Sequence, residues 1–353
     1  MLSMSQFSNY LANDGSSILT QNRMVKNWRK YGLILVALLG LAELVLRFVF
    51  GFCNAPLYIE DPDFEYVFAP NQHRFRFRNV VKTNEFSMRS EPINPTDTTV
   101  VLLIGDSVIN GGNPTSHDDL ASTILEKQFT AHYHQPVRVL NVSAGSWGPD
   151  NAFAFLKKKG FFGADVICLV TSSHDAYDNM SHHKLVGENP NYPDKQYKVA
   201  LYEFWHRYIY TLFIYHYIEA PLKAWLAPAT QHAPNDVIHK FGTTFNVGYQ
   251  QLADTTKAMG IPFLMYLHPE LPEIAQNRYD SQGEEILAFA RKNHIPVIDE
   301  LKLHPTNELF RNPDFDSIHY NAKGQAFMAK HLYPVLKQYL DAYFARYARS
   351  HRP

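Results

Sequence analysis

The sequence predicts an α/β fold: a three-layer α/β/α sandwich with about five parallel strands, together with one N-terminal transmembrane helix. The sandwich is predicted by short runs rich in Val, Ile and Leu that alternate with segments of helical pattern from Thr99 onward, because such runs are typical of parallel strands buried on both faces. The additional helix is predicted by a nearly continuous apolar stretch at residues 31–52, which is long enough to cross a bilayer.

Length and composition limit what the chain can be. Its 353 residues, of which 46% are hydrophobic, suffice for one large α/β domain with appendages. The 33 Lys and Arg residues nearly balance the 34 Asp and Glu residues, so no broad basic surface for nucleic acid is expected. Cys53 and Cys168 are the only cysteines, which argues against a disulfide framework and against a thiolate metal site.

The apolar stretch 31–52 carries only two charges, Glu43 and Arg47, which are four residues apart and can pair on one helix face. Four basic residues precede it: Arg23, Lys26, Arg29 and Lys30. By the positive-inside tendency, residues 1–30 form a cytoplasmic tail and the rest of the chain lies on the periplasmic or extracellular side. Two alternatives stay open, a buried helix of a soluble protein and a cleaved signal peptide, although no small-x-small cleavage site follows the stretch.

The remaining segments follow in order. Residues 53–98 are rich in Pro, Asn, Arg and aromatic residues without a sustained period, which predicts a linker that becomes a surface extension. Residues 99–346 form the predicted α/β domain. Its strands are expected at residues 100–104, 137–142, 165–170, 261–267 and 295–300, and its last two helices at about 282–293 and 321–343. Such a sandwich places its functional groups directly after the strands, at their carboxyl ends.

An insertion at about residues 180–246 interrupts the alternation. Its segment 201–226 is aromatic, but five polar side chains make it too polar for a second membrane span: Glu203, His206, Arg207, His216 and Glu219. One interpretation is a lid or a platform for sugars or acyl chains, built from Trp205, Tyr208, Tyr210 or Trp225. The other, which periodic aromatic residues favour, is an amphipathic helix that packs these rings on the core.

A candidate nucleophile follows the first strand, where the chain reads Gly105, Asp106, Ser107. A serine at a strand-to-helix turn projects its hydroxyl over the edge of the sheet, and its backbone N–H can help to bind an oxyanion. A serine that caps a helix gives the same local pattern, so this block alone does not identify a catalytic site.

The second half of a catalytic site is predicted near the C-terminus, where Asp316 and His319 stand three residues apart before a long helix. A serine hydroxyl needs a base to accept its proton, and the base needs a carboxylate that holds it in the right tautomer. The order of these blocks on an α/β chain therefore predicts a triad of Ser107, His319 and Asp316.

With these blocks the chain, from about Thr99 to the C-terminal helix, resembles the SGNH (GDSL-like) hydrolase superfamily, and in particular its membrane-anchored bacterial members. The resemblance implies a flavodoxin-like sandwich in which Ser107 attacks an ester carbonyl, His319 acts as general base and Asp316 orients His319. Asp314 is a nearby carboxylate, but its spacing from His319 does not match the family's block.

The same resemblance implies two further donors to the oxyanion hole beside Ser107. A glycine-rich turn after the second strand supplies a backbone N–H from Gly145 or Ser146. After the third strand the family has an asparagine where this chain has His174, and Asp175 follows it, with a structural role expected. An imidazole can donate one hydrogen bond where the amide would, but the change is also compatible with a weak or inactive relative.

Other motifs predict no cofactor and no metal ion. Two histidine pairs lack a carboxylate or cysteine at ligand spacing, so solvated side chains are expected there: His132 with His134, and His182 with His183. Residues 105–112 lack the Gly-Lys-Ser/Thr of a phosphate-binding loop. Gly148 is expected to end the glycine-rich turn before the next helix, and His268, after the fourth strand, either lines the pocket or is structural.

The sequence therefore predicts two-step acyl transfer through the triad. The leading hypothesis is an esterase that removes acyl groups, acetyl in particular, from glycans or lipids of the cell envelope. A polysaccharide O-acetyltransferase with the same triad is the first alternative, because water and a sugar hydroxyl enter the same intermediate. A catalytically weak carbohydrate-binding or assembly protein is the second. The expected partners are an ester-bearing glycan or lipid, the membrane and polysaccharide-assembly proteins.

Overall fold

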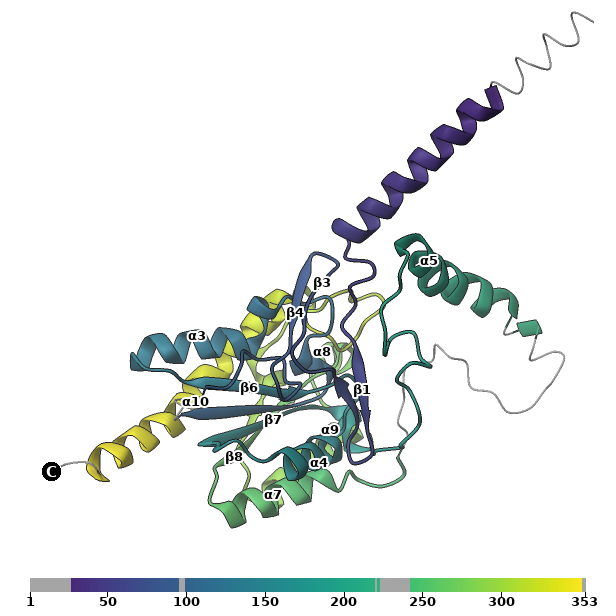
Figure 1. Cartoon of the computed structure of the whole chain (residues 1–353). Helices are drawn as coiled ribbons and strands as arrows, with labels where there is room; N and C mark the ends of the chain where they lie inside the picture. Colours follow the sequence, from purple (N-terminus) through teal and green to yellow (C-terminus); the bar gives the residue numbers. More distant parts are fainter. Residues whose placement is uncertain (1–26, 95–98, 220, 223–241, 351–353) are drawn as a thin grey trace, which may run out of the picture.

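The computed structural model describes residues 27–94, 99–219, 221–222 and 242–350 (Figure 1). Its centre is a five-stranded parallel sheet in the order β6-β5-β7-β8-β9. The strands are β5 (Val100–Gly105), β6 (Arg138–Ser143), β7 (Val166–Ser172), β8 (Phe263–His268) and β9 (Val297–Asp299). Helices flank this sheet, so the predicted α/β sandwich with about five parallel strands is confirmed.

Two layers of helices cover the two faces of the sheet. One layer consists of α4 (Pro149–Lys159), α7 (Gly248–Met259) and α9 (Ser281–Lys292), and the other of α3 (Ala121–Tyr133) and α10 (Ala322–Ser350). Successive side chains of a strand point to opposite faces. In β5, Leu102 and Ile104 accordingly join the core under α4, whereas Val101 and Leu103 join the core under α3. Burial on both faces explains the uninterrupted apolar sequence of these strands.

The connectivity of the sheet marks where a site is expected. Chain order reverses around β5, because β6 lies on one side of it and β7, β8 and β9 follow on the other. In open α/β sheets ligands bind at such a switch point, outside the carboxyl ends of the strands. Ser107 follows β5 directly, as the first residue of the short helix α2 (Ser107–Asn110). Other short elements lie between the main ones: η1 (His117–Asp119), η2 (Ser173–Ala176), α8 (Leu271–Gln276), η4 (Glu300–Leu303) and η5 (Asn307–Leu309).

The segment before the sheet folds into two antiparallel hairpins. The first pairs β1 (Tyr58–Asp61) with β2 (Glu65–Phe68), and the second pairs β3 (His73–Arg76) with β4 (Asn79–Lys82). Phe64, Tyr66 and Met88 from this segment are buried in the same core as α4. Four-residue strands are too short to show a clear hydrophobic period, which is why the sequence predicts only a linker and surface extension here.

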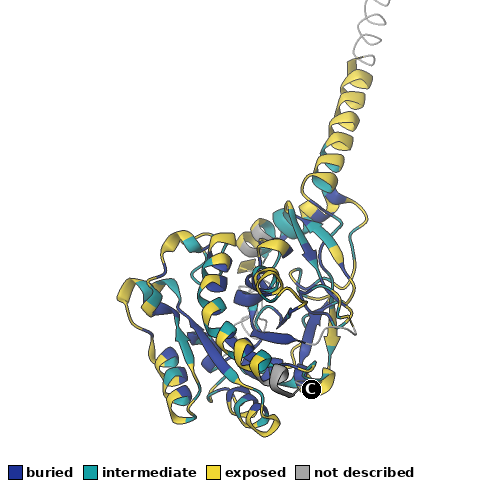
Figure 2. Ribbon diagram, turned by 90° about the vertical axis from the view of Figure 1, so that its left-hand side faces the viewer, coloured by how far each residue is buried: buried dark blue, intermediate teal, exposed yellow. Residues whose placement is uncertain are grey.

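An N-terminal helix, Asn27–Phe48, precedes the hairpins and projects away from the α/β domain (Figure 2). It is long and apolar enough to cross a membrane, and none of its most apolar window is buried in the chain. A core helix of a soluble protein would be buried, so that alternative is wrong. A signal sequence passes the same test. Residues 1–26 of the predicted tail, with Arg23 and Lys26, fall outside the described residues. Residues 27–30, predicted as tail, belong to the helix, which ends at Phe48 and not at residue 52.

The insertion contains a helical segment formed by α5 (Ala200–Phe204) and the π-helical η3 (Trp205–Glu219). The sequence pattern favoured packing of its rings on the core. Instead Trp205 is 49% exposed and Tyr217 is 71% exposed, so the core interpretation is wrong for these rings. Tyr208 differs, because its ring contacts Phe52 and Phe77 beside the second hairpin. Trp225 falls outside the described residues.

Candidate active site

The turn between β5 and α2 presents Ser107. A Cβ atom on Gly105 would lie 2.3 Å from the carbonyl oxygen of Val170 in the neighbouring strand β7, so only glycine fits where the strand ends. Asp106 then caps α2, with its carboxylate accepting a hydrogen bond of 2.9 Å from the backbone N–H of Val108. The tight strand end and the capped turn together fix the direction of the Ser107 side chain.

The structure brings the three predicted triad residues together. Ser107 Oγ lies 2.8 Å from Nε2 of His319, and Nδ1 of His319 lies 2.9 Å and 3.0 Å from the two carboxylate oxygens of Asp316. These contacts assign the neutral tautomer with the proton on Nδ1, leaving Nε2 to accept from the serine hydroxyl. Asp314, the rejected carboxylate, is exposed. The serine, base and carboxylate are therefore in the order that nucleophilic catalysis requires.

Asp316 is held ionised by its surroundings. Partial burial opposes ionisation, but hydrogen bonds from the His319 side chain and from two backbone N–H groups outweigh it and lower the pKa of Asp316 to about 2. These backbone donors belong to Ile318, at 3.2 Å, and His319, at 2.9 Å. A charged carboxylate at neutral pH keeps the imidazole in the tautomer that faces Ser107.

The glycine-rich turn follows β6, which pairs with β5 up to the end that precedes Ser107. Among the hydrogen bonds of the described residues, none uses the backbone N–H of Ser107, Gly145 or Ser146. Ser146 adopts a left-handed conformation with φ +56°, which is uncommon for a residue with a side chain. Gly148 is the N-cap residue of α4, as expected for the end of the turn. The backbone N–H groups of Ser107, Gly145 and Ser146, which were predicted as oxyanion donors, thus form no hydrogen bond among the described residues that would compete with a ligand.

Tyr66, from the first hairpin, controls the orientation of one of these groups. Its hydroxyl donates to the carbonyl oxygen of Gly145 at 2.8 Å, and Tyr192 from the insertion donates to the same oxygen at 3.5 Å. In a trans peptide the carbonyl and the following N–H point in opposite directions. Anchoring the Gly145 carbonyl therefore turns the N–H of Ser146, which shares its peptide plane, away from the two tyrosines.

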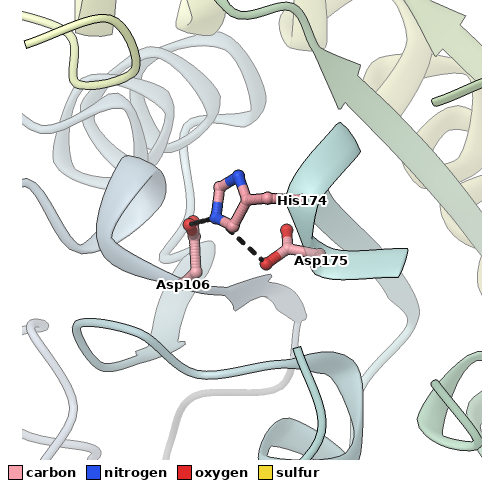
Figure 3. Close-up of side chains that lie close together, drawn as sticks. All are labelled: Asp106, His174 and Asp175. Carbon is pink, nitrogen blue, oxygen red and sulfur yellow. Dashed lines mark ion pairs between the residues drawn. The ribbon is translucent and has the colours of Figure 1, made fainter. Parts of the chain in front are cut away.

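His174 lies among carboxylates. Its Nδ1 is 3.1 Å from Glu270, and its Nε2 is 3.6 Å from Asp106 and 3.5 Å from Asp175 (Figure 3). Burial lowers the pKa of His174, but the charges of Asp175 and Asp106 and the hydrogen bond to Glu270 outweigh this and raise the pKa well above its usual value. The raised pKa favours the charged form of a ring that lies among buried carboxyl groups. Its Nε2–H has no short acceptor, since both Nε2 contacts exceed ordinary hydrogen-bond length.

Asp175 has the structural role expected from the sequence. One carboxylate oxygen accepts from the Thr171 hydroxyl at 2.9 Å and from the backbone N–H of Ser172 at 2.8 Å. Its other oxygen has no hydrogen-bond partner among the described residues. Burial and the charge of Asp106 raise the pKa of Asp175 well above its usual value, whereas the neighbouring His174 ring acts to lower it.

The same cluster is the one arrangement of described residues that could hold a metal ion. Ligand atoms of Asp106, His174 and Asp175 lie within 4.8 Å of one another. A proton on Nε2 of His174 supplies the positive charge that these carboxylates need and competes with a metal for that nitrogen. The two histidine pairs are exposed, as expected: His132, His134, His182 and His183.

His268 is structural, which decides between the two roles that the sequence left open. It is fully buried, with Nδ1 2.8 Å from Glu300 and Nε2 2.8 Å from the carbonyl oxygen of Ile318. Tyr320 also donates to Glu300. The residues on either side of His319 are thereby tied to the end of β8, which fixes the backbone at His319.

Two arginines that the sequence did not single out hold the loop after α2. Arg89 donates to the carbonyl oxygens of Asn110 at 2.6 Å, Gly112 at 2.8 Å and Thr115 at 3.1 Å, and Arg311 donates to Gly111 in the same loop. Burial and the charge of Arg311 lower the pKa of Arg89 to about 9. No motif marks such residues, because they bind backbone oxygens whose positions only the fold defines.

No protein-family model and no curated protein sequence matches the chain. Solved structures do: a lipase/acylhydrolase from Enterococcus faecalis with 12% identity, a TM-score of 0.39 and coverage of 68% of this chain and 96% of that one, and TesA with 13% identity, a TM-score of 0.38 and coverage of 68% and 99%. An acetyl xylan esterase, AlAXEase, has 13% identity and a TM-score of 0.38, with 67% of this chain and 98% of that one covered.

Proposed function

We propose that the protein is a membrane-anchored serine esterase of the SGNH type, which removes acyl groups, acetyl in particular, from glycans or lipids of the cell envelope. One observation carries the proposal: the continuous hydrogen-bonded line from Ser107 Oγ through His319 to the ionised carboxylate of Asp316. A binding protein that had lost catalysis would have no reason to keep these atoms in register.

In the first step, His319 Nε2 takes the proton of the Ser107 hydroxyl while Oγ attacks the ester carbonyl carbon. The new Oγ–C bond forms a tetrahedral intermediate, which collapses when the alcohol leaves with the proton that His319 holds. Water then attacks the acyl-enzyme with the same base, and the acid leaves as Ser107 recovers its proton. Asp316 stays ionised throughout and stabilises the imidazolium of His319.

The intermediate's oxyanion needs donors that are already in place. The backbone N–H groups of Ser107 and Ser146 are the donors we assign, because they are unused and the Gly145 carbonyl is anchored by Tyr66. His174 contributes chiefly as an imidazolium that neutralises Asp106 and Asp175, since an uncompensated carboxylate next to Ser107 would oppose a developing negative charge. Its Nε2–H reaches an oxyanion only by leaving these carboxylates.

A cavity of about 480 Å³ opens beside Glu270, the carboxylate that binds His174. Acidic residues line it: Glu270, Glu273, Asp280 and Glu284. Carboxylates accept hydrogen bonds from hydroxyl groups, so the cavity suits the sugar part of an acylated glycan better than an acidic one. The cavity reaches the site through Glu270, which contacts His174, and this supports a glycan ester as substrate.

The test is hydrolysis of p-nitrophenyl acetate by the full-length chain in detergent micelles, beside its Ser107→Ala variant. We expect nitrophenol release by the native chain and none above background by the variant. Equal release by both would contradict the proposal. Adding an unacetylated oligosaccharide distinguishes hydrolysis from transfer, because acetate that appears on the sugar identifies an O-acetyltransferase with the same triad.

A further inference from the structure

The helical insertion segment, defined here as residues 199–219, 221 and 222, has its polarity reversed relative to an ordinary surface helix. Every side chain described as exposed in this segment is apolar, aromatic or proline. The most exposed large ones are Tyr217 at 71%, Ile218 at 61% and Phe213 at 58%. Surface helices of soluble domains carry charged residues on their outer face. The exposed face of this segment lacks them among its described side chains and therefore favours an apolar environment over water.

Two charged residues of the segment, Glu203 and Arg207, instead turn inward. Glu203 is fully buried and pairs with Arg76 of the second hairpin at 2.8 Å and with Arg207 at 3.3 Å. Glu203 also accepts from the backbone N–H of Cys53, just after the N-terminal helix. These contacts dock the segment on the hairpins through its polar side and leave the apolar side uncovered.

The segment begins against the N-terminal helix. Glu43 accepts hydrogen bonds from the backbone N–H groups of Ala200 and Leu201, both at 2.8 Å, and Arg47 donates to the carbonyl oxygen of Lys198 at 2.7 Å. The sequence predicts only that Glu43 and Arg47 pair with each other. In the structure they also form hydrogen bonds with backbone groups at the start of the insertion helix. Figure 1 shows the two helices meeting at this point, on the side of the chain away from α3 and α10.

The meeting point has a defined depth along the N-terminal helix. Glu43 precedes the last helical residue, Phe48, by five positions, which corresponds to about 7 Å along the helix axis. Amphipathic helices that lie in a membrane surface bury their apolar face by ~5–10 Å. If the N-terminal helix spans the bilayer up to its end, the insertion segment starts at the depth of such a helix.

We propose that the insertion segment is a second membrane contact, whose exposed rings lie in the headgroup and upper acyl region of the bilayer that the N-terminal helix enters. Its partner is the phospholipid bilayer itself. Trp and Tyr are the residues enriched at this depth, and Trp205, Tyr202 and Tyr217 supply them on the exposed side. The inference rests on membrane insertion of the N-terminal helix and is independent of the serine chemistry.

The full-length chain reconstituted in phosphatidylcholine vesicles tests this inference, with lipids brominated near the top of the acyl chain as quenchers. A double variant, Trp28→Phe with Trp225→Phe, leaves two tryptophans: the reporter Trp205 and Trp147, which is buried in the core. Adding Trp205→Phe leaves Trp147 alone and so measures its background fluorescence. We expect Trp205 emission to shift to the blue on reconstitution and to be quenched by the brominated lipid but little by aqueous acrylamide.

A matched variant with Trp205→Phe and Trp225→Phe uses Trp28, at the start of the N-terminal helix, to report on the anchor. Lipid quenching of Trp28 without quenching of Trp205 would overturn the second contact while leaving the anchor intact. Shielding of Trp205 from both lipid and acrylamide would also overturn it, because a protein partner would then cover the face. Absence of lipid quenching at both positions would overturn the anchor together with the inference. A cooperative urea unfolding transition of each variant shows that the domain is folded, whether or not the chain hydrolyses esters.

Discussion

Replacing Tyr66 by Phe removes one hydroxyl and leaves the ring in place. The hydroxyl donates to the Gly145 carbonyl at 2.8 Å, and the Tyr66 side chain is 1% exposed, so water cannot readily replace it. A buried hydrogen bond of this kind contributes about 1 kcal/mol. Without it the Gly145–Ser146 peptide can turn, and the Ser146 N–H loses its fixed direction towards the proposed oxyanion.

The size of the effect follows from two limits. Complete removal of an oxyanion donor costs about 100- to 1,000-fold in kcat. Here the donor remains and Tyr192, at 3.5 Å from the same carbonyl oxygen, can take over part of the anchoring. If the lost ~1 kcal/mol appears in the transition state, kcat falls by roughly fivefold. KM should change little, because the oxyanion exists only after attack.

Steady-state hydrolysis of p-nitrophenyl acetate measures this split between kcat and KM. Tyr58→Phe is the matched control, since its ring packs on Tyr66 and Tyr192 in the same cluster, and it should leave kcat unchanged. Adding Tyr192→Phe to Tyr66→Phe should lower kcat further. A kcat for Tyr66→Phe equal to that of Tyr58→Phe, despite a loss of stability in urea unfolding, would show that the contact is merely structural and refute the reasoning.

Three further substitutions test other parts of the site. Asp316→Asn should keep the fold but lower kcat by roughly 10,000-fold, because the amide favours the wrong His319 tautomer; a loss below tenfold would remove Asp316 from the triad. His174→Asn should destabilise the protein most below about pH 6.5 and less as pH rises through the raised His174 pKa. Urea unfolding at several pH values tests this, and a difference in unfolding free energy between native chain and variant that grew with pH would contradict it. His268→Asn should cost ~3 kcal/mol in unfolding free energy by leaving Glu300 buried without its partner, whereas His331→Asn, on the half-buried side of α10, should cost far less.

The sequence predicts the sandwich and the triad because both rest on local patterns. Buried parallel strands are uninterrupted apolar runs, and all five expected runs overlap strands of the sheet. Ser107 stands two residues after the end of β5, where the fold rule places functional groups. Asp316 and His319 follow no strand of the sheet but lie between η5 and α10, so their prediction rests on the spacing of the two residues before a long helix.

The supporting residues could not be predicted in the same way. Arg89 and Tyr66 act through backbone carbonyl oxygens of residues 110–115 and 145, and a carbonyl oxygen carries no signature in a sequence. The carboxylates around His174 come from three separate segments, after β5, β7 and β8. Among these supporting residues only His268 could be singled out from the sequence, because it stands at the end of a strand. That position does not distinguish a pocket residue from a structural one.

The folded unit around the candidate site is larger than the α/β pattern that begins at Thr99. Met88 and Phe64 fill the core under α4, Arg89 binds three carbonyl oxygens of the loop after α2, and Tyr66 anchors the Gly145 peptide. A fragment that started at Thr99 would lose all of these contacts and leave apolar core surface open to water. The two hairpins also bind the insertion through Arg76 and Glu203, and the insertion binds the N-terminal helix through Glu43 and Arg47. The residues proposed to orient the oxyanion donor therefore belong to the same set of contacts that connects the α/β domain to the N-terminal helix.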